Sequence, residues 1–289
     1  MIPNNNLSVL PWYTSIEQQN ARKWWIYGRI YPLFTPAGFL PPWQLMFDHN
    51  TSITKNSITQ IELCEWNTPY TIDYTDEIKA GITLRRFANL GYDIFVFPGT
   101  LPTFDSMLNG RYYLRMRIAS KTYYSEVFTV VNDIQPYLKL TWWDNSDFTM
   151  DAGTIVYANP IFKNVLYLQA DIAKPEYPFE EEGETRDGYF FPTKQISEKR
   201  YRFNFLASEY LLDVMRFIRM ADFAEIEYHG QRYSLDTFLI TPEWESNGDV
   251  AAVEAVFDTA TVAKKIGLGY IKAQRGDFNS DFNNDFNNE

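Results

Sequence analysis

The chain has 289 residues, 45% of them hydrophobic and 22% charged, which is enough for two domains with a full apolar core and a normal solvated surface. The formal net charge of -11 argues against a sequence-independent nucleic-acid binder, which needs a basic footprint, and against electrostatic binding to anionic lipid. Aromatic residues make up 17% of the chain, and because they favour strands and protein interfaces, the composition indicates a β-rich protein that makes extensive contacts.

The N-terminal segment, residues 1–44, is rich in Pro, Trp, Tyr and Asn and has no sustained hydrophobic period. We expect an extended arm, or an edge element wrapped on another part of the structure, with Trp24 and Trp25 as contact residues. No basic stretch precedes an apolar core here, so no secretory signal is visible, and no apolar run in the chain approaches the roughly 20 residues that cross a bilayer. We therefore expect synthesis in the cytoplasm and no membrane anchor.

Residues 45–134 are predicted to form an immunoglobulin-like β-sandwich, because several short strands closed by a hairpin are typical of that fold. Alternation of apolar and polar residues indicates strands over 58–66, 82–87, 92–97, 112–118 and 123–131. The strand 112–118 has the clearest pattern, and it places four apolar side chains on one face: Tyr112, Leu114, Met116 and Ile118. A polar turn at Ser120-Lys121 predicts a hairpin with the next strand. The single cysteine, Cys64, excludes an internal disulfide and is expected to be an inert strand residue.

Residues 135–272 are predicted to form a second β-sandwich or barrel with one flanking helix. The same alternation indicates strands over 138–143, 161–172, 200–205, 224–240 and 253–262. The fourth of these is expected to be a hairpin that turns at His229-Gly230, and the acidic run 180–184 is expected to be a loop. The helix, 208–220, begins at a capping serine and carries a buried stripe formed by Leu211, Val214, Met215 and Ile218. Recurrent strand–helix alternation is missing from the sequence, which argues against a parallel βαβ fold.

No constellation of catalytic residues is visible in the sequence. Of the two histidines, His229 lies in the predicted turn, and His49 lies in a polar break where a hydrolytic triad would need a distant serine and carboxylate to converge. One cysteine and two separated histidines cannot supply a zinc site of the usual spacing, and neither phosphate-binding glycine motif occurs. We therefore expect no enzymatic activity and no cofactor.

Two groups of acidic residues have alternative interpretations. The acidic run together with Asp187 offers oxygen ligands for calcium but lacks the spacing of a calcium loop, so a solvated loop or a rim that faces a basic neighbour is the expected role. Asp144 and Asp147 follow Trp142-Trp143, a pattern that would suit glycosidic cleavage or sugar stacking. The competing interpretation is that Trp142 and Trp143 lie on opposite faces of a strand, one in the core and one in an interface.

The C-terminal tail, residues 273–289, ends in a four-residue unit, Asp-Phe-Asn-Ser/Asn, that is repeated three times from Asp277. In an extended chain this spacing places the three phenylalanines on one face: Phe278, Phe282 and Phe286. Two interpretations follow, a disordered terminus or a tape that docks into pockets of a neighbouring subunit. The regular spacing of the aromatic residues favours docking.

A further indication comes from five distinctive phrases of the sequence: YYSEVF at 123–128, KPEYPFEEEGE at 174–184, RDGYFFP at 186–192, QISEK at 195–199 and TPEW at 241–244. With these phrases the chain, over residues 40–289, resembles structural proteins of phages and prophages of Bacteroidetes hosts, including crAss-like phages. The Asp-Phe-Asn-Asn ending is similar to endings of proteins from the same phages. The resemblance implies a virion component of the tail or connector region, built as a symmetric ring, and it supplies no catalytic residues.

These observations lead to the hypothesis of a non-enzymatic virion structural protein that forms a ring in the tail or the tail-connector of a bacteriophage. Its expected partners are further copies of itself in a cyclic homo-oligomer and other virion tail or connector proteins, after synthesis in the cytoplasm of the bacterial host. The expected contact residues are Trp24, Trp25, Trp142, Trp143, Phe278, Phe282 and Phe286. The alternatives are a glycan-binding adhesion or receptor-binding β-sandwich module, and a glycoside hydrolase domain that uses Asp144 or Asp147.

Overall fold

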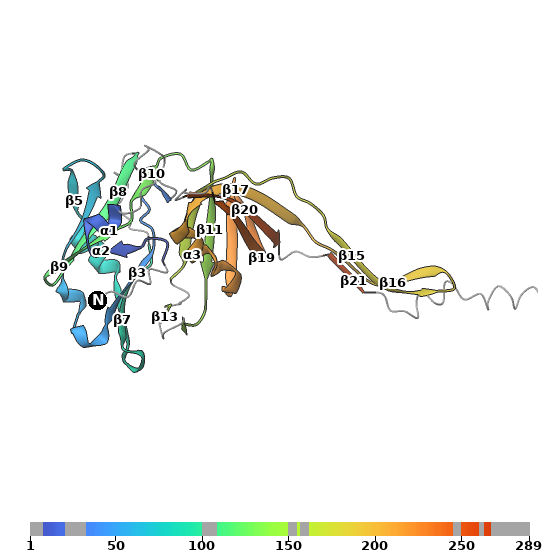
Figure 1. Ribbon diagram of the computed structural model, residues 1–289, viewed down its shortest axis with the longest axis horizontal. Coiled ribbons are helices and arrows are strands. Elements are labelled where there is room, and N and C mark those ends of the chain that lie inside the picture. Colours follow the sequence, from blue (N-terminus) through green and yellow to red (C-terminus); the bar gives the residue numbers. More distant parts are fainter. Residues whose placement is uncertain are drawn as a thin grey trace, which may run out of the picture.

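The computed structural model describes residues 8–20, 33–99, 109–149, 155–156, 162–244, 250–259 and 263–266. The described chain is mainly β, which confirms the predicted fold class. Figure 1 shows three parts: an N-terminal lobe, a second lobe, and a narrow three-stranded arm that projects from the second lobe away from the first.

The N-terminal lobe is built from ten strands and two short helices. The strands are β1 (Trp12–Tyr13), β2 (Phe34–Pro36), β3 (Trp43–Asp48), β4 (Ile58–Glu65), β5 (Thr71–Asp73), β6 (Thr83–Phe87), β7 (Tyr92–Phe97), β8 (Gly110–Ile118), β9 (Lys121–Ser125) and β10 (Phe128–Val131). The helices are α1 (Ile16–Asn20) and α2 (Thr75–Gly81), with 3-10 turns η2 (His49–Thr51), η3 (Lys55–Ser57) and η4 (Ala88–Leu90).

The second lobe and the arm contain the remaining elements. The strands of the lobe are β11 (Tyr137–Trp143), β14 (Asn164–Gln169), β17 (Arg200–Ser208), β18 (Phe223–Tyr228), β19 (Gln231–Trp244) and β20 (Val250–Thr259), with the helix α3 (Glu209–Met215) and the 3-10 turn η6 (Ile218–Met220). A separate pair is formed by β12 (Phe148–Thr149) and β13 (Ile155–Val156). The arm consists of β15 (Phe179–Arg186), β16 (Tyr189–Ser197) and β21 (Ala263–Ile266).

One sheet of 13 strands runs through both lobes in the order β1-β9-β8-β10-β2-β14-β11-β18-β19-β20-β17, and β4 and β5 pair beside β8. The strand β2 joins the lobes because it pairs in parallel with β10 and antiparallel with β14. A second sheet, β3-β7-β6, packs on the N-terminal part of the large sheet, with Phe47 against Tyr123 and Trp43 against Trp12. The lobe is therefore a sandwich, but its sheet continues into the next predicted domain.

The hairpin of β8 and β9 confirms the strongest strand prediction. Ile118 is paired with Lys121 across the turn, and the four apolar side chains of the predicted face are buried: Tyr112, Leu114, Met116 and Ile118. The predicted strand 123–131 is divided at Glu126-Val127, so that β9 and β10 pair with successive parts of β8.

The described parts of residues 1–44 are not a free arm. Six of their apolar side chains are buried in the main core: Val9, Leu10, Trp12, Leu33, Leu40 and Trp43. The strand β1 pairs with β9 at the end of the large sheet, which matches the alternative prediction of an edge element. Short apolar segments between prolines have no period, and this is why the sequence did not indicate their burial.

The helix of the second lobe is shorter than the predicted segment 208–220. The predicted stripe is buried beside the aromatic residues of β17: Leu211, Val214, Met215 and Ile218 pack in one cluster with Tyr201, Phe203 and Phe205. The helix ends at Met215, and the last turn has 3-10 geometry. Ser208 stands before the first helical residue, but its side chain makes no capping hydrogen bond.

Candidate interaction surface on the projecting arm

The acidic segment that was predicted to be a loop is instead a strand of the arm. β15 pairs antiparallel with β16 from Phe179 opposite Ser197 to Arg186 opposite Tyr189, and β21 lies on the other edge of β16. The two strands turn at Asp187-Gly188, both of which have a positive φ (49° and 82°). Consecutive glutamates have low strand propensity and no alternation, so only the pairing with β16 makes this segment a strand.

The register of the arm shifts between Glu182 and Gly183, where Thr193 of β16 forms a β-bulge because no residue of β15 lies opposite it. The Thr193 hydroxyl donates to the Glu182 carbonyl at 3.1 Å. A Cβ atom at Gly183 would lie 2.7 Å from Cζ of Phe190 and would also collide with the carbonyl group of Phe191. Only glycine therefore fits where the two strands approach at the bulge.

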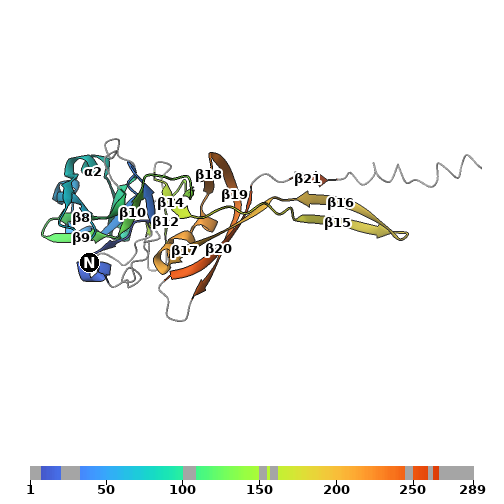
Figure 2. The ribbon, with the colours of Figure 1, turned by 90° about the horizontal axis from the view of Figure 1, so that it is seen from above.

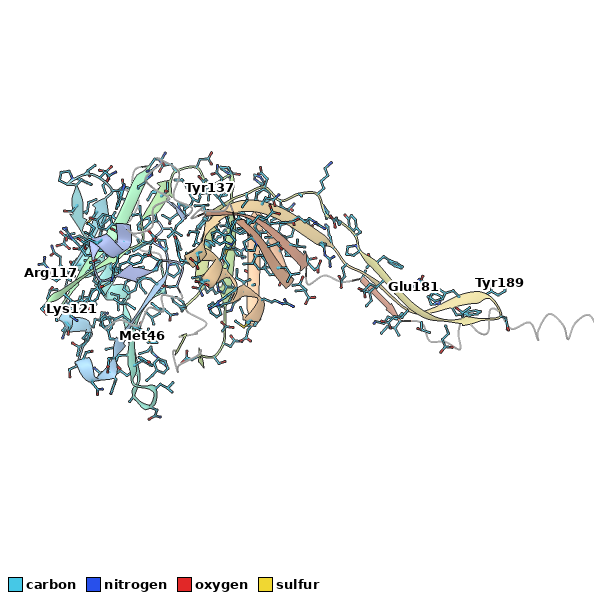
Figure 3. The ribbon with its side chains drawn as sticks, in the orientation of Figure 1. Met46, Arg117, Lys121, Tyr137, Glu181 and Tyr189 are labelled. Atoms are coloured by element: carbon cyan, nitrogen blue, oxygen red, sulfur yellow. The ribbon has the colours of Figure 1, made fainter. Side chains whose placement is uncertain are left out.

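Side chains along the arm are exposed on both faces of the sheet. Five of them are large and apolar: Tyr177 (66% exposed), Phe179 (59%), Tyr189 (71%), Phe190 (49%) and Ile266 (66%). Between them lie polar contacts such as the ion pair of Lys194 with Glu182 at 2.6 Å. Figure 3 places Glu181 on the arm and Tyr189 towards its tip, far from Arg117 and Lys121 at the opposite end of the molecule. The arm thus carries exposed aromatic side chains both near its base, at Tyr177 and Phe179, and beside its turn, at Tyr189 and Phe190.

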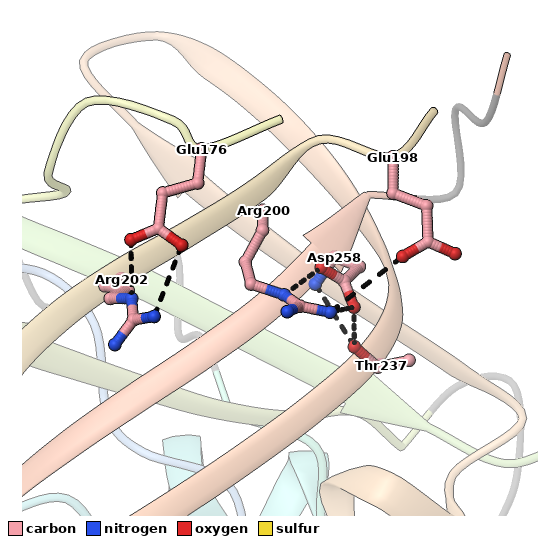
Figure 4. Close-up of polar contacts among 6 residues, drawn as sticks. All are labelled: Glu176, Glu198, Arg200, Arg202, Thr237 and Asp258. Atoms are coloured by element: carbon pink, nitrogen blue, oxygen red, sulfur yellow. Dashed lines mark hydrogen bonds and ion pairs between the residues drawn. The ribbon is translucent and has the colours of Figure 1, made fainter. Parts of the chain in front are cut away.

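The first ionic contact at the base of the arm centres on Arg202 of β17. Its guanidinium group contacts Glu176, which precedes β15, with Nε at 3.0 Å from one carboxylate oxygen and Nη2 at 3.2 Å from the other. Nη1 donates to Glu254 of β20 at 3.0 Å. Figure 4 shows the two contacts between Arg202 and Glu176. The three side chains thus tie the entry of the arm to two strands of the lobe.

The second ionic contact at the base lies deeper. Arg200 donates to both carboxylate oxygens of Asp258, from Nε at 2.8 Å and from Nη2 at 3.2 Å, and the Thr237 hydroxyl donates to Asp258 at 2.8 Å (Figure 4). The Asp258 side chain is only 8% exposed. Burial raises the pKa of its carboxyl group, but the hydrogen bonds from Arg200 and Thr237 and the Arg200 charge outweigh burial and hold the pKa below its usual value.

Backbone hydrogen bonds also join the base of the arm to the second lobe. Glu176 and Arg200 exchange backbone hydrogen bonds of 2.8 and 3.0 Å, and the amide of Thr259 donates to the carbonyl of Lys199 at 3.2 Å. Since β16 is followed almost directly by β17, the arm continues the main sheet and is anchored on both sides of its base. We expect a stiff projection and not a loosely attached loop.

The two neighbouring tryptophans lie on opposite faces of β11, as predicted. Trp142 is 2% exposed in the core, so it is not available for contacts with another subunit. Trp143 is half-buried, and Phe223 from β18 stacks on its ring at 5.2 Å between centroids. The ammonium group of Lys163 lies 3.7 Å from the same ring centre. These two contacts occupy the stacking surface that a sugar would need.

Asp144 takes part in a structural contact. The backbone amide of Asp222 donates to Asp144, and the amide of Asn145 donates to Asp222, both at 2.9 Å. Burial raises the pKa of the Asp144 carboxyl group, and the nearby Asp222 charge adds to this rise, although the hydrogen bond from the Asp222 amide opposes it. These two hydrogen bonds join the loop that follows β11 to the segment that precedes β18. Asp147 is exposed.

The structure adds a partner for His49 that the sequence did not reveal. Its Nδ1 atom lies 2.7 Å from the carboxylate of Asp93, whose side chain is 2% exposed. Asp93 is a charged residue inside the otherwise apolar run of β7, and this was the signal in the sequence that it needs a buried partner. Within the described chain no serine hydroxyl bonds to His49, so the pair does not extend into a triad. His229 lies in the predicted turn, with a φ of 48°.

A groove of about 290 Å³ is lined by residues of the second lobe together with Phe39 and Pro98 of the N-terminal lobe. Its lining residues are Phe39, Pro98, Lys139, Thr141, Lys163, Val165, Glu225, Glu227 and Arg232. Glu227 pairs with Lys139 at 3.8 Å and with Arg232 at 3.6 Å. Charges of both signs therefore line the groove, and two of its three basic side chains pair with Glu227.

Other features of the described residues give no further candidate site. They include no group of three or more His, Cys, Asp or Glu side chains that would hold a metal ion. Cys64 is buried, and burial raises the pKa of its thiol. No helix in the described ranges is long and apolar enough to cross a membrane.

The remaining predicted contact residues, Trp24, Trp25, Phe278, Phe282 and Phe286, lie outside the described residues. In comparisons with known proteins, no family model matches this chain and no curated protein matches it.

Proposed function

We propose that the chain is a non-enzymatic virion structural protein that forms a ring in the tail or tail-connector of a bacteriophage. The arm is the observation that carries the proposal. It exposes large apolar side chains on a thin three-stranded sheet that no other described strand or helix covers with a second layer. Such a sheet gains stability when another subunit covers it.

Burial of the arm's apolar side chains against another subunit is more favourable than their exposure to solvent. Burying one large apolar side chain contributes roughly 1.5–3 kcal/mol, so covering only Tyr189 and Phe190 would release enough free energy to matter for association. The anchored base supports this role, since an interface built on a stiff element loses less conformational entropy on binding than a loop does. The aromatic content of 17% also suits a subunit with large interfaces.

The charge of the chain supports a place in a DNA conduit. A net charge of -11 reduces non-specific adhesion of DNA, which passes through the tail and connector of a phage. The resemblance of the sequence phrases to structural proteins of Bacteroidetes phages supports the same location.

Glycan binding is the second candidate, and the geometry at Trp143 disfavours it. A sugar-stacking platform needs an open aromatic face, whereas Phe223 and Lys163 occupy this ring. A glycan-array signal from the monomer that disappears in Trp143→Ala would reverse this ranking.

The test is sedimentation velocity of the purified full-length chain across a range of concentrations, with negative-stain microscopy of the largest species. The expected result is a single large species whose images are closed rings with one copy number. A chain that sediments as a monomer at every concentration, and that is absent from purified phage particles, would refute the proposal.

A further inference from the structure

Two strand edges of opposite charge lie in different parts of the molecule, β15 on the arm and β6 in the N-terminal lobe. We propose that β15 of one copy pairs with β6 of the next copy, so that neighbouring subunits are joined by a shared β-sheet. The inference rests on the proposed function and specifies which surfaces meet in the ring.

Both strands are open at one edge. β6 pairs with β7 and with no other described strand, and three of its five side chains are exposed: Thr83, Arg85 and Arg86. β15 pairs with β16 and with no other strand of the described chain, and each of its described side chains is exposed. An open edge presents a row of backbone donors and acceptors that a further strand can complete.

The charges on the two edges are complementary. β15 carries four glutamates, Glu180, Glu181, Glu182 and Glu184, whereas β6 carries the neighbouring arginines Arg85 and Arg86. Successive side chains of a strand point to opposite faces, so each strand presents its charge on both faces of the sheet. Pairing the strands therefore places a glutamate near an arginine on each face, whichever direction the strands take.

The same charges disfavour the alternative pairings. Two copies of β15 would bring glutamates together, and two copies of β6 would bring arginines together, and like charges on directly opposite residues destabilise a sheet. Because the attractive contact joins two different surfaces, it is heterologous, and contacts of this kind produce rings when the rotation closes.

The placement of the two edges fits a contact between copies. In Figures 1 and 2 the arm extends from the second lobe in the direction away from the N-terminal lobe, which carries β6. Figure 3 shows the arm reaching far beyond both lobes, so that β15 is remote from the β6 of its own chain and free to meet another copy.

The test is charge reversal on each edge. The first variant is Glu180→Lys with Glu181→Lys, and the second is Arg85→Glu with Arg86→Glu. Each alone is expected to raise the protein concentration needed for half-assembly by about tenfold or more, because two attractive pairs become repulsive. An equimolar mixture of the two variants is expected to recover assembly, since each β15 then meets a β6 of opposite charge.

The matched control for the first variant is Asp236→Lys with Glu243→Lys, which makes the same change of charge at two exposed residues of β19. It is expected to assemble as the unaltered chain does. Circular dichroism and thermal unfolding check that all variants are folded.

Disulfide trapping provides a second readout. Cysteines at 180, 181 or 182 are combined with a cysteine at 85 or 86, while the buried Cys64 is left in place. Oxidation is expected to give a ladder of covalent multimers with at least one combination, and no more than dimers with each single cysteine.

The outcomes separate the inference from the proposed function. Rings that tolerate both reversals and give no ladder with any cysteine combination would overturn the β15–β6 contact and leave the ring intact. A full-length chain that stays monomeric in every experiment and is absent from purified phage particles would overturn both.

Discussion

The base of the arm offers a quantitative test through Arg200. Arg200→Ala removes two hydrogen bonds, of 2.8 and 3.2 Å, from a carboxylate that is 8% exposed, and leaves Asp258 with the Thr237 hydroxyl. A hydrogen bond to a charged group contributes about 1.5–3 kcal/mol, and since Arg200 itself is 35% exposed, solvent screening reduces this value. We expect the free energy of unfolding to fall by about 1–2 kcal/mol at pH 7.

The same contact predicts a dependence on pH. The folded-state pKa of Asp258 is held below its usual value, so its contribution to stability is present above the unfolded pKa and is lost as the pH falls through the folded pKa. In Arg200→Ala burial and the Thr237 hydrogen bond remain while the hydrogen bonds and the charge of Arg200 are lost, so the pKa of Asp258 is expected to rise. The stabilities of the variant and the unaltered chain should therefore converge at acidic pH.

Urea unfolding of both chains from pH 7 down to pH 3 measures this difference. Arg202→Ala is the control, because its contacts are more exposed, and we expect a smaller loss of stability than for Arg200→Ala. Equal losses for the two variants, or a loss at Arg200 that does not change with pH, would refute the role given to Asp258.

Three further predictions follow from other parts of the chain. His49→Ala leaves the Asp93 carboxylate buried without the histidine, and urea unfolding should show that the free energy of unfolding falls by about 2 kcal/mol. A fall of less than about 0.5 kcal/mol would mean that water replaces the histidine. Gly183→Ala introduces a collision at the bulge, and amide hydrogen exchange should become faster in the arm alone. Gly188→Ala is the control, because its added Cβ meets no atom within 4 Å, and equal effects of the two variants would contradict the collision. Deletion of 277–289 should leave a folded chain with an unchanged melting temperature that assembles poorly by sedimentation; normal entry into particles would rule out the docking tape.

Alternation allowed the strands with one buried face to be predicted from the sequence. β8 and β17 have strict apolar alternation, and in both the predicted inward side chains are buried. The turn at His229-Gly230 was predicted from its glycine, and both residues have a positive φ. Local patterns were sufficient for these elements because burial of one face is recorded in every second residue.

The arm could not be predicted in this way. Both of its faces meet solvent, so β15 has no apolar alternation, and its four glutamates suggested a loop. Its position as a strand depends on pairing with β16, and its orientation depends on the contact of Arg200 with Asp258, 58 residues further along the chain. Contacts between residues so far apart leave no periodic signal in one sequence. The same holds for His49 and Asp93, which are separated by 44 residues.

The decisive measurement is electron cryo-microscopy of particles purified from the phage that encodes this chain. We expect density for this fold at one axial level of the tail or connector, repeated around the axis, with each arm in contact with the next copy. Particles without this chain, or copies that stand apart on the particle periphery with uncovered arms, would contradict this expectation.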